Sequence, residues 1–284
     1  MSGAGWLAGG IRLLVTVVVA CALAACSAMQ LTYNNADVLA RFMASDYADL
    51  SAEQSAHFKA RFAALHGWHR HQELPIYAQL LRTTGERIDR RLTTEDIRWA
   101  IDAVRDRYHR LVVRAVVEGA PVLASLTPEQ HAQLEKRFSE NNRKYAKDNL
   151  EGDEKKLNSR RASRLNDYFS DWIGRLTDAQ EERIARFAPE HGRVQALRME
   201  DRRRRQREAL LILRSERDPS RLARRLATLF ANPDEGRSAE YEAAMARYET
   251  RLAELVIDID RSLNEEQRAR AVRRAKRYSD DFSV

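Results

Sequence analysis

Apolar residues recur at helical spacing along nearly all of the chain after residue 36. From Ile97 to Ala115 they are separated by alternating steps of four and three residues, and the same spacing runs from Met245 to Ile259. Such steps place apolar side chains on one face of an α-helix, which is expected to pack against other helices. The sequence has no convincing alternating strand pattern and no Asn-Gly or Asp-Gly turn. We therefore predict an all-α fold, an elongated multi-helix bundle.

Proline and glycine indicate where the predicted helices begin and end. Pro128 and Pro219 stand at the first helical position, where the missing amide of proline is tolerated. Pro75 and Pro189 fall inside helical patterns and are expected to break or kink them. Left-handed C-terminal caps are expected at Gly119, Gly152, Gly174 and Gly236. Helices are predicted at residues 36–47, 51–73, 75–90, 94–118, 128–150, 153–174, 178–215, 219–230, 238–261 and 264–282.

Residues 1–25 are predicted to be a cleaved lipoprotein signal peptide. The apolar run from Leu13 to Leu23 follows a single charged residue, and it is too short for a stable membrane span. It ends in Leu23-Ala24-Ala25-Cys26, which resembles the lipobox of bacterial lipoproteins. The resemblance implies cleavage before Cys26 and lipid attachment to that residue, with residues 26–33 as a short tether. An ordinary secretory signal followed by a stray cysteine is the alternative.

The residue after the cysteine and the cysteine count refine this picture. Ser27, by resemblance to lipoprotein sorting signals, favours the outer membrane and its periplasmic face. Two or three acyl chains hold a protein on a bilayer durably. Cys21 would leave with the signal peptide, so the mature chain would have no free thiol and no disulfide. Cysteine nucleophiles and zinc–thiolate sites are therefore excluded.

The charge balance bears on partners. Without Arg12 the chain has 48 Lys and Arg against 42 Asp and Glu, a net charge of about +6. Export argues against nucleic acid and favours anionic lipid, acidic polymers or envelope proteins as partners, in addition to the membrane that holds the anchor. A solvated surface of mixed charge is the alternative. No cofactor is expected.

A short motif that begins with leucine and ends with glutamine occurs at residues 50–54, 126–130, 176–180 and 263–267. Its second residue is Ser, Thr or Asn, which with the glutamine forms a capping box at a helix N-terminus. As a helix start the motif needs no other role. It also resembles the motif of the LTXXQ periplasmic proteins, helical stress-response chaperones and sensor regulators that act without ATP.

A second resemblance covers the whole mature chain. It rests on four stretches of sequence, which are Tyr33-Asn34-Asn35-Ala36-Asp37, Trp68-His69-Arg70, Glu73-Leu74-Pro75-x-Tyr77 and Asn141-Asn142-Arg143-x-Tyr145. These stretches resemble an uncharacterised family of bacterial lipoproteins, domain of unknown function family 6279. The resemblance implies a helical envelope lipoprotein with no assigned activity.

The motif copies also suggest an internal duplication. Ser51 and Thr177 are 126 residues apart, and Gln130 and Gln267 are 137 apart. Ala-Arg-Phe-Ala at 60–63 recurs at 185–188. We expect residues 34–284 to form one helical domain, and we hypothesise two related halves, 34–150 and 160–284, that bury their apolar stripes against each other.

Two clusters are candidate sites. His66, His69, His71 and Glu73 lie close in sequence, and His69 and Glu73 share a helical face that suits zinc or copper, although a surface cluster is the alternative. A dense arginine run is a candidate anion-binding site, because guanidinium groups match phosphate oxygens, although a solvated helix face is the alternative. Its members are Arg202, Arg203, Arg204, Arg205 and Arg207.

Catalytic signatures such as Gly-x-Ser-x-Gly, a glycine-rich phosphate loop or His-Glu-x-x-His are missing from the sequence. The sequence therefore favours a non-enzymatic lipoprotein that binds other envelope components, as a chaperone or assembly factor does. An envelope hydrolase, a metal-binding protein and a purely structural lipoprotein remain as alternatives.

Overall fold

The computed structural model describes residues 33, 35–232 and 234–283, and every regular element within these ranges is helical. The predicted all-α fold is confirmed. Cys26, the signal peptide and the tether as far as Thr32 lie outside the described residues. The elements are α2 (Ala36–Ala48), α3 (Ala52–Trp68), the π-helical turn η1 (His69–Glu73), α4 (Leu74–Asp89), α5 (Thr94–Ala124), α6 (Pro128–Asn149), α7 (Glu154–Ile173), α8 (Asp178–Ser215), α9 (Pro219–Ala231), α10 (Ala239–Arg261) and α11 (Glu265–Asp281).

The prolines and glycines that were expected to interrupt helices do not all do so. Pro75 follows the π-helical turn, in which the amide of Leu74 donates to the His69 carbonyl, so the chain passes the proline without a loop. Helix α8 continues through Pro189. The three glycines at 152, 174 and 236 have positive φ, but only Gly174 caps a helix, at the end of α7. Gly152 follows the C-cap of α6, and Gly236 lies in the turn between α9 and α10, so the caps predicted there are wrong.

The cap predicted at Gly119 is wrong, because α5 continues to Ala124. Ala120 and Val122 are 1% and 4% exposed. Burial of this last segment outweighs the roughly 1 kcal/mol by which glycine disfavours a helix.

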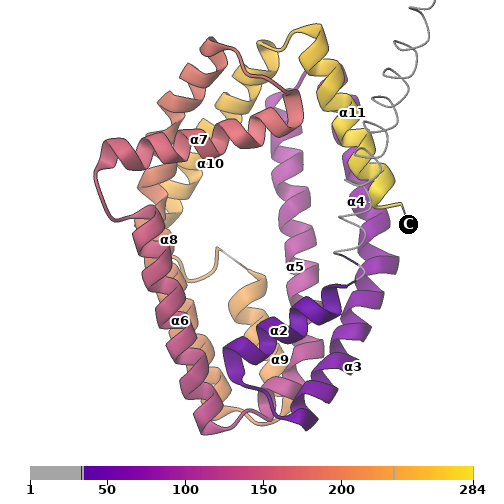
Figure 1. The fold of residues 1–284 in the computed structure, drawn as a ribbon, viewed down its shortest axis with the longest axis vertical. Coiled ribbons are helices and arrows are strands. Elements are labelled where there is room, and N and C mark those ends of the chain that lie inside the picture. Colours follow the sequence, from indigo (N-terminus) through magenta and orange to yellow (C-terminus); the bar gives the residue numbers. More distant parts are fainter. Residues whose placement is uncertain (1–32, 34, 233, 284) are drawn as a thin grey trace, which may run out of the picture.

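Two hydrophobic cores lie toward opposite ends of an elongated frame (Figure 1). One joins α5, α6, α8 and α9, with Leu134, Leu213 and Leu222 among its buried residues. The other joins α4, α7, α8, α10 and α11, around Ile184 and Ile259. Each core therefore takes helices from both halves of the chain, and α8 contributes to both. The frame is held together by the burial of each half against the other.

The four capping boxes meet in two pairs. The side-chain amides of Gln54 and Gln130 exchange hydrogen bonds of 2.9 and 2.7 Å, and those of Gln180 and Gln267 exchange two of 3.1 Å. All four glutamines also accept from the backbone amide of their own N-cap residue, as the capping box requires. The motif thus joins helix starts far apart in sequence, a role beyond capping a single helix.

The two pairs have matching surroundings. Gln54 donates to the carbonyl of Ser125, and Gln180 donates to the hydroxyl of Ser262. Residues 52–89, covering α3 to α4, equal the 38 residues of α8 in length at an offset of 126. The larger offset of 137 follows from the break between α9 and α10, where the first half has the unbroken α5. These equivalences support the proposed duplication at an offset of 126.

Candidate functional site: a groove between α4 and α5

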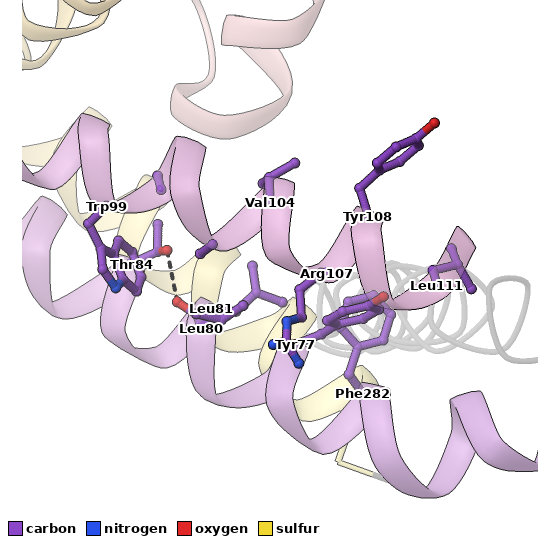
Figure 2. Close-up of a pocket in the computed structure, with 12 residues that line it drawn as sticks. Tyr77, Leu80, Leu81, Thr84, Trp99, Val104, Arg107, Tyr108, Leu111 and Phe282 are labelled. Carbon is purple, nitrogen blue, oxygen red and sulfur yellow. Dashed lines mark hydrogen bonds between the residues drawn. The ribbon is translucent and has the colours of Figure 1, made fainter. Parts of the chain in front are cut away.

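An apolar groove of about 470 Å³ runs between α4 and α5 (Figure 2). Its walls include Leu80 and Leu81 from α4, and Trp99 and Leu111 from α5. Phe282, just after α11, closes one side. The hydroxyl of Thr84 in the wall donates to the Leu80 carbonyl at 2.8 Å, so its proton is already used within α4. Apart from Arg107 and the tyrosine hydroxyls, the groove therefore presents mostly carbon to whatever enters it.

The groove exists because α4 packs closely against α11 instead of α5. Gly85 and Ala275 face each other there, and a Cβ added at Gly85 would lie 3.3 Å from that of Ala275. Small residues let two helices approach closely. With this face committed to α11, the face of α4 toward α5 stays open.

The rim of the groove is exposed to solvent. Val104 is 68% exposed and Tyr108 is 40% exposed, and Figure 2 shows both projecting outward from α5. The apolar stripe from Ile97 to Ala115 was expected to be covered by other helices, and at these two positions that expectation is wrong. Tyr108 belongs to this stripe, so the sequence predicts it in the core, and that prediction is also wrong. An uncovered apolar rim of this kind is typical of a binding surface.

A buried ionic cluster stands beside the groove. Glu73, the last residue of the π-helical turn, is fully buried, and its carboxylate accepts from Arg107 at 3.3 Å and Arg110 at 3.0 Å. Arg107 also lines the groove. A buried carboxylate with two arginine partners holds the α3–α4 segment against α5 at a fixed distance. π-Helical turns are frequent at functional sites.

Aromatic rings connect the start of the described chain to the groove. The hydroxyl of Tyr33 and Nδ1 of His69 are 2.9 Å apart, and the rings of His69 and Tyr77 are 5.4 Å apart. Tyr77 in turn packs against Phe282 at 6.1 Å, and both line the groove. Burial lowers the pKa of His69, although the Glu73 carboxylate opposes the shift. His69 therefore stays neutral near pH 7 and packs as an aromatic ring.

The metal site proposed at His69 and Glu73 is not supported by this geometry. Both oxygens of Glu73 are engaged by arginines, and Nδ1 of His69 faces Tyr33. His71 is exposed on the turn, and the ring of His66 packs at a tilt against that of Tyr33, with 4.5 Å between the ring centres. Across the described part of the chain, no three His, Cys, Asp or Glu residues are grouped so as to hold a metal ion.

The arginine run on α8 does not form one site. Arg204 and Arg205 both pair with Asp201, at 2.7 and 2.8 Å. Arg202 lies over the ring of Tyr145 at 5.7 Å. Arg203 and Arg207 are exposed and line a shallow depression between α6 and α8. The run therefore splays around the helix, and three of its five members are used within the fold.

The sequence contained one signal for the groove. The stretches Trp68-His69-Arg70 and Glu73-Leu74-Pro75-x-Tyr77 surround the π-helical turn, and Tyr77 lines the groove itself. Arg107 and Arg110, the partners of Glu73, stand one turn apart on α5 and were not singled out. Arginines among the apolar positions of a helix are the pattern that could have indicated a buried carboxylate partner.

Fold and site together define an all-helical protein with a side-open apolar groove braced by a buried ion cluster. Within the described ranges, no helix combines the length and hydropathy that crossing a bilayer requires. The chain belongs to the family of unknown function DUF6279, whose model matches residues 46–242. Comparisons with curated proteins and with solved structures found no match.

Proposed function

We propose that this protein is a lipid-anchored, non-enzymatic protein on the periplasmic face of the outer membrane, and that its α4–α5 groove binds apolar segments of other envelope proteins. The observation that carries the proposal is the open apolar groove with its exposed rim. The lipobox at Cys26 supports the location. The resemblance to LTXXQ chaperones supports the same class of activity, binding without ATP.

The shape of the groove favours a polypeptide over a lipid. A groove open along one side covers only part of its occupant. An acyl chain is apolar all round, so its uncovered side would stay in water. An amphipathic helix turns its polar face outward and buries its apolar face, which suits a rim such as Val104 and Tyr108. The groove follows α5 from Trp99 to Leu111, about 18 Å at 1.5 Å per residue, the length of roughly three helical turns.

Aggregation suppression tests the proposal. The protein should reduce light scattering by a denatured secreted protein diluted from guanidinium. Val104→Glu should abolish most of this effect, because it places a carboxylate on the groove rim. Leu211→Glu is the matched control, because Leu211 is 64% exposed on α8, away from the groove.

Three outcomes would contradict the proposal. Loss of the effect in both variants would mean that general surface apolarity, not the groove, is responsible. No suppression by the wild-type protein at any ratio would favour the purely structural alternative. Suppression that a fatty acid abolishes in the wild type, with no binding of a labelled amphipathic peptide, would identify the groove as a lipid site instead.

A further inference from the structure

Helix α2 exposes a continuous apolar stripe. Val38, Leu39, Phe42 and Met43 are 54%, 54%, 72% and 52% exposed. Their spacing of one and four residues places them on one face of the helix. Four large apolar side chains exposed on a helix of 13 residues need a partner, since scattered single residues do not form such a patch.

Two residues near the C-terminal end of α2 fix the helix to the body of the protein. The hydroxyl of Tyr47 accepts from Asn141 at 2.6 Å, and its ring packs against Phe138 at 6.5 Å. The backbone carbonyl of Asp46 accepts from Arg137 at 2.9 Å, and the carboxylate of Asp46 also pairs with Arg137. These contacts to α6 hold α2 in place, and its apolar stripe stays exposed to solvent.

We propose that the apolar stripe of α2 lies in the interface of the membrane that carries the anchor, so that α2 seats the protein on the lipid surface. The inference rests on the proposed lipidation of Cys26. Ala36, where α2 begins, follows Cys26 by ten residues, which reach at most about 33–36 Å when extended. A helix tethered this closely, with an apolar face that no other element of the described residues covers, has the character of an interfacial helix.

Charge and size distinguish lipid from other occupants. On α2, Asp37 pairs with Arg41 at 3.5 Å and Asp46 pairs with Arg137, so the helix has no unpaired charge that favours anionic headgroups. Insertion would therefore depend on apolar burial and would be insensitive to salt. A stripe from Val38 to Met43 is only about 8 Å long. A patch of this length would bury far less surface than the roughly 800 Å² per partner that a stable dimer interface needs.

Site-specific fluorescence tests the inference with the full-length lipidated protein. The mature chain has no cysteine besides Cys26, so Phe42→Cys introduces one reactive thiol for an environment-sensitive dye. The protein is reconstituted in phosphatidylcholine vesicles whose acyl chains are brominated. We expect the dye at position 42 to be quenched at least three-fold more than a dye at Leu211→Cys, at both low and high salt. Val38→Cys should repeat the result one turn away.

The outcomes are separable. Dye labelling of wild-type Cys26, or a mass without acyl groups, would overturn the proposed anchor and not by itself the role of α2. Equal quenching at positions 42 and 211 in lipidated, vesicle-bound protein would overturn the role of α2. Shielding of position 42 from aqueous iodide before vesicles are added, without bromide quenching afterwards, would assign the stripe to a second copy of the chain and would also overturn it.

Discussion

Gln54 and Gln130 lie 76 residues apart in sequence, and their side-chain amides exchange a reciprocal pair of hydrogen bonds. Gln180 and Gln267 repeat this arrangement across 87 residues. Gln130 and Gln267 are both buried, at 9% and 6% exposed, but their partners differ: Gln180 is fully buried, whereas Gln54 is half-buried. Water can replace the lost partner in the first pair but not in the second.

We therefore expect Gln180→Ala to lower the free energy of unfolding by about 2–3 kcal/mol, and Gln54→Ala by about 1 kcal/mol. The larger loss follows because water can reach the half-buried site of Gln54 but not the fully buried site of Gln180, so Gln267 would lose this partner without replacement. Urea denaturation of both variants measures the difference. Equal losses would show that the two pairs contribute only through helix capping.

The Glu73 cluster predicts a second stability effect. Glu73→Gln removes the charge that the Arg107 and Arg110 guanidinium groups face, and the carboxylamide can accept from only one of them well. We expect a loss of about 2–3 kcal/mol in the free energy of unfolding. Glu53→Gln, at an exposed position in the first turn of α3, is the control and should change stability by less than about 0.5 kcal/mol. A Glu73→Gln variant as stable as the wild type would contradict the bracing role of this cluster.

His191 predicts a pH dependence of stability. Burial, with Arg198, Arg161 and Arg164 nearby, lowers the pKa of His191 to about 4 in the folded protein, against 6.5 for an exposed histidine. The unfolded chain therefore binds a proton first as the pH falls. The contribution of neutral His191 to the free energy of unfolding is therefore complete above pH 6.5 and is lost as the pH falls toward 4.

His191→Gln removes this titration while an amide can still bond to Tyr248 and Gln195, which contact His191 at 3.0 and 2.7 Å. We expect the wild type to lose about 2 kcal/mol more than this variant between pH 7 and pH 5. His71→Gln, at an exposed position, should follow the wild-type curve. Parallel curves for His191→Gln and the wild type would contradict the prediction.

The anchor predicts a change of location. Cys26→Ser should leave the protein without lipid and shift it from the membrane to the soluble fraction or to the uncleaved precursor. Metabolic labelling with a fatty acid and membrane fractionation measure this. A variant that is still lipid-labelled and sediments with the outer membrane would contradict the proposed attachment at Cys26.

Local chemistry made most of the helices predictable. Ser51, Thr127 and Thr177 are N-caps whose hydrogen bonds are made within three residues, so the sequence alone shows where those helices begin. The end of α5 was not predictable in this way. Distant helices bury Ala120, and this burial continues the helix past Gly119.

The groove depends on contacts still further apart. It opens because Gly85 packs on Ala275, 190 residues away, and draws α4 from α5. A helical stripe in the sequence says that a face is apolar, but it does not say whether the fold itself covers that face. For the same reason, Val104 reads as a core residue in the sequence and lies at an exposed rim in the structure.

The central claim, that the α4–α5 groove binds polypeptide segments in the envelope, is tested most directly by photo-crosslinking in living cells. A photoreactive phenylalanine analogue replaces Val104 in one strain and Leu211 in another. We predict crosslinks at position 104 to segments of envelope proteins with an apolar face, and at most a small fraction of these at position 211. Crosslinks at position 104 to lipid alone, or equal crosslinking to protein at both positions, would contradict the claim.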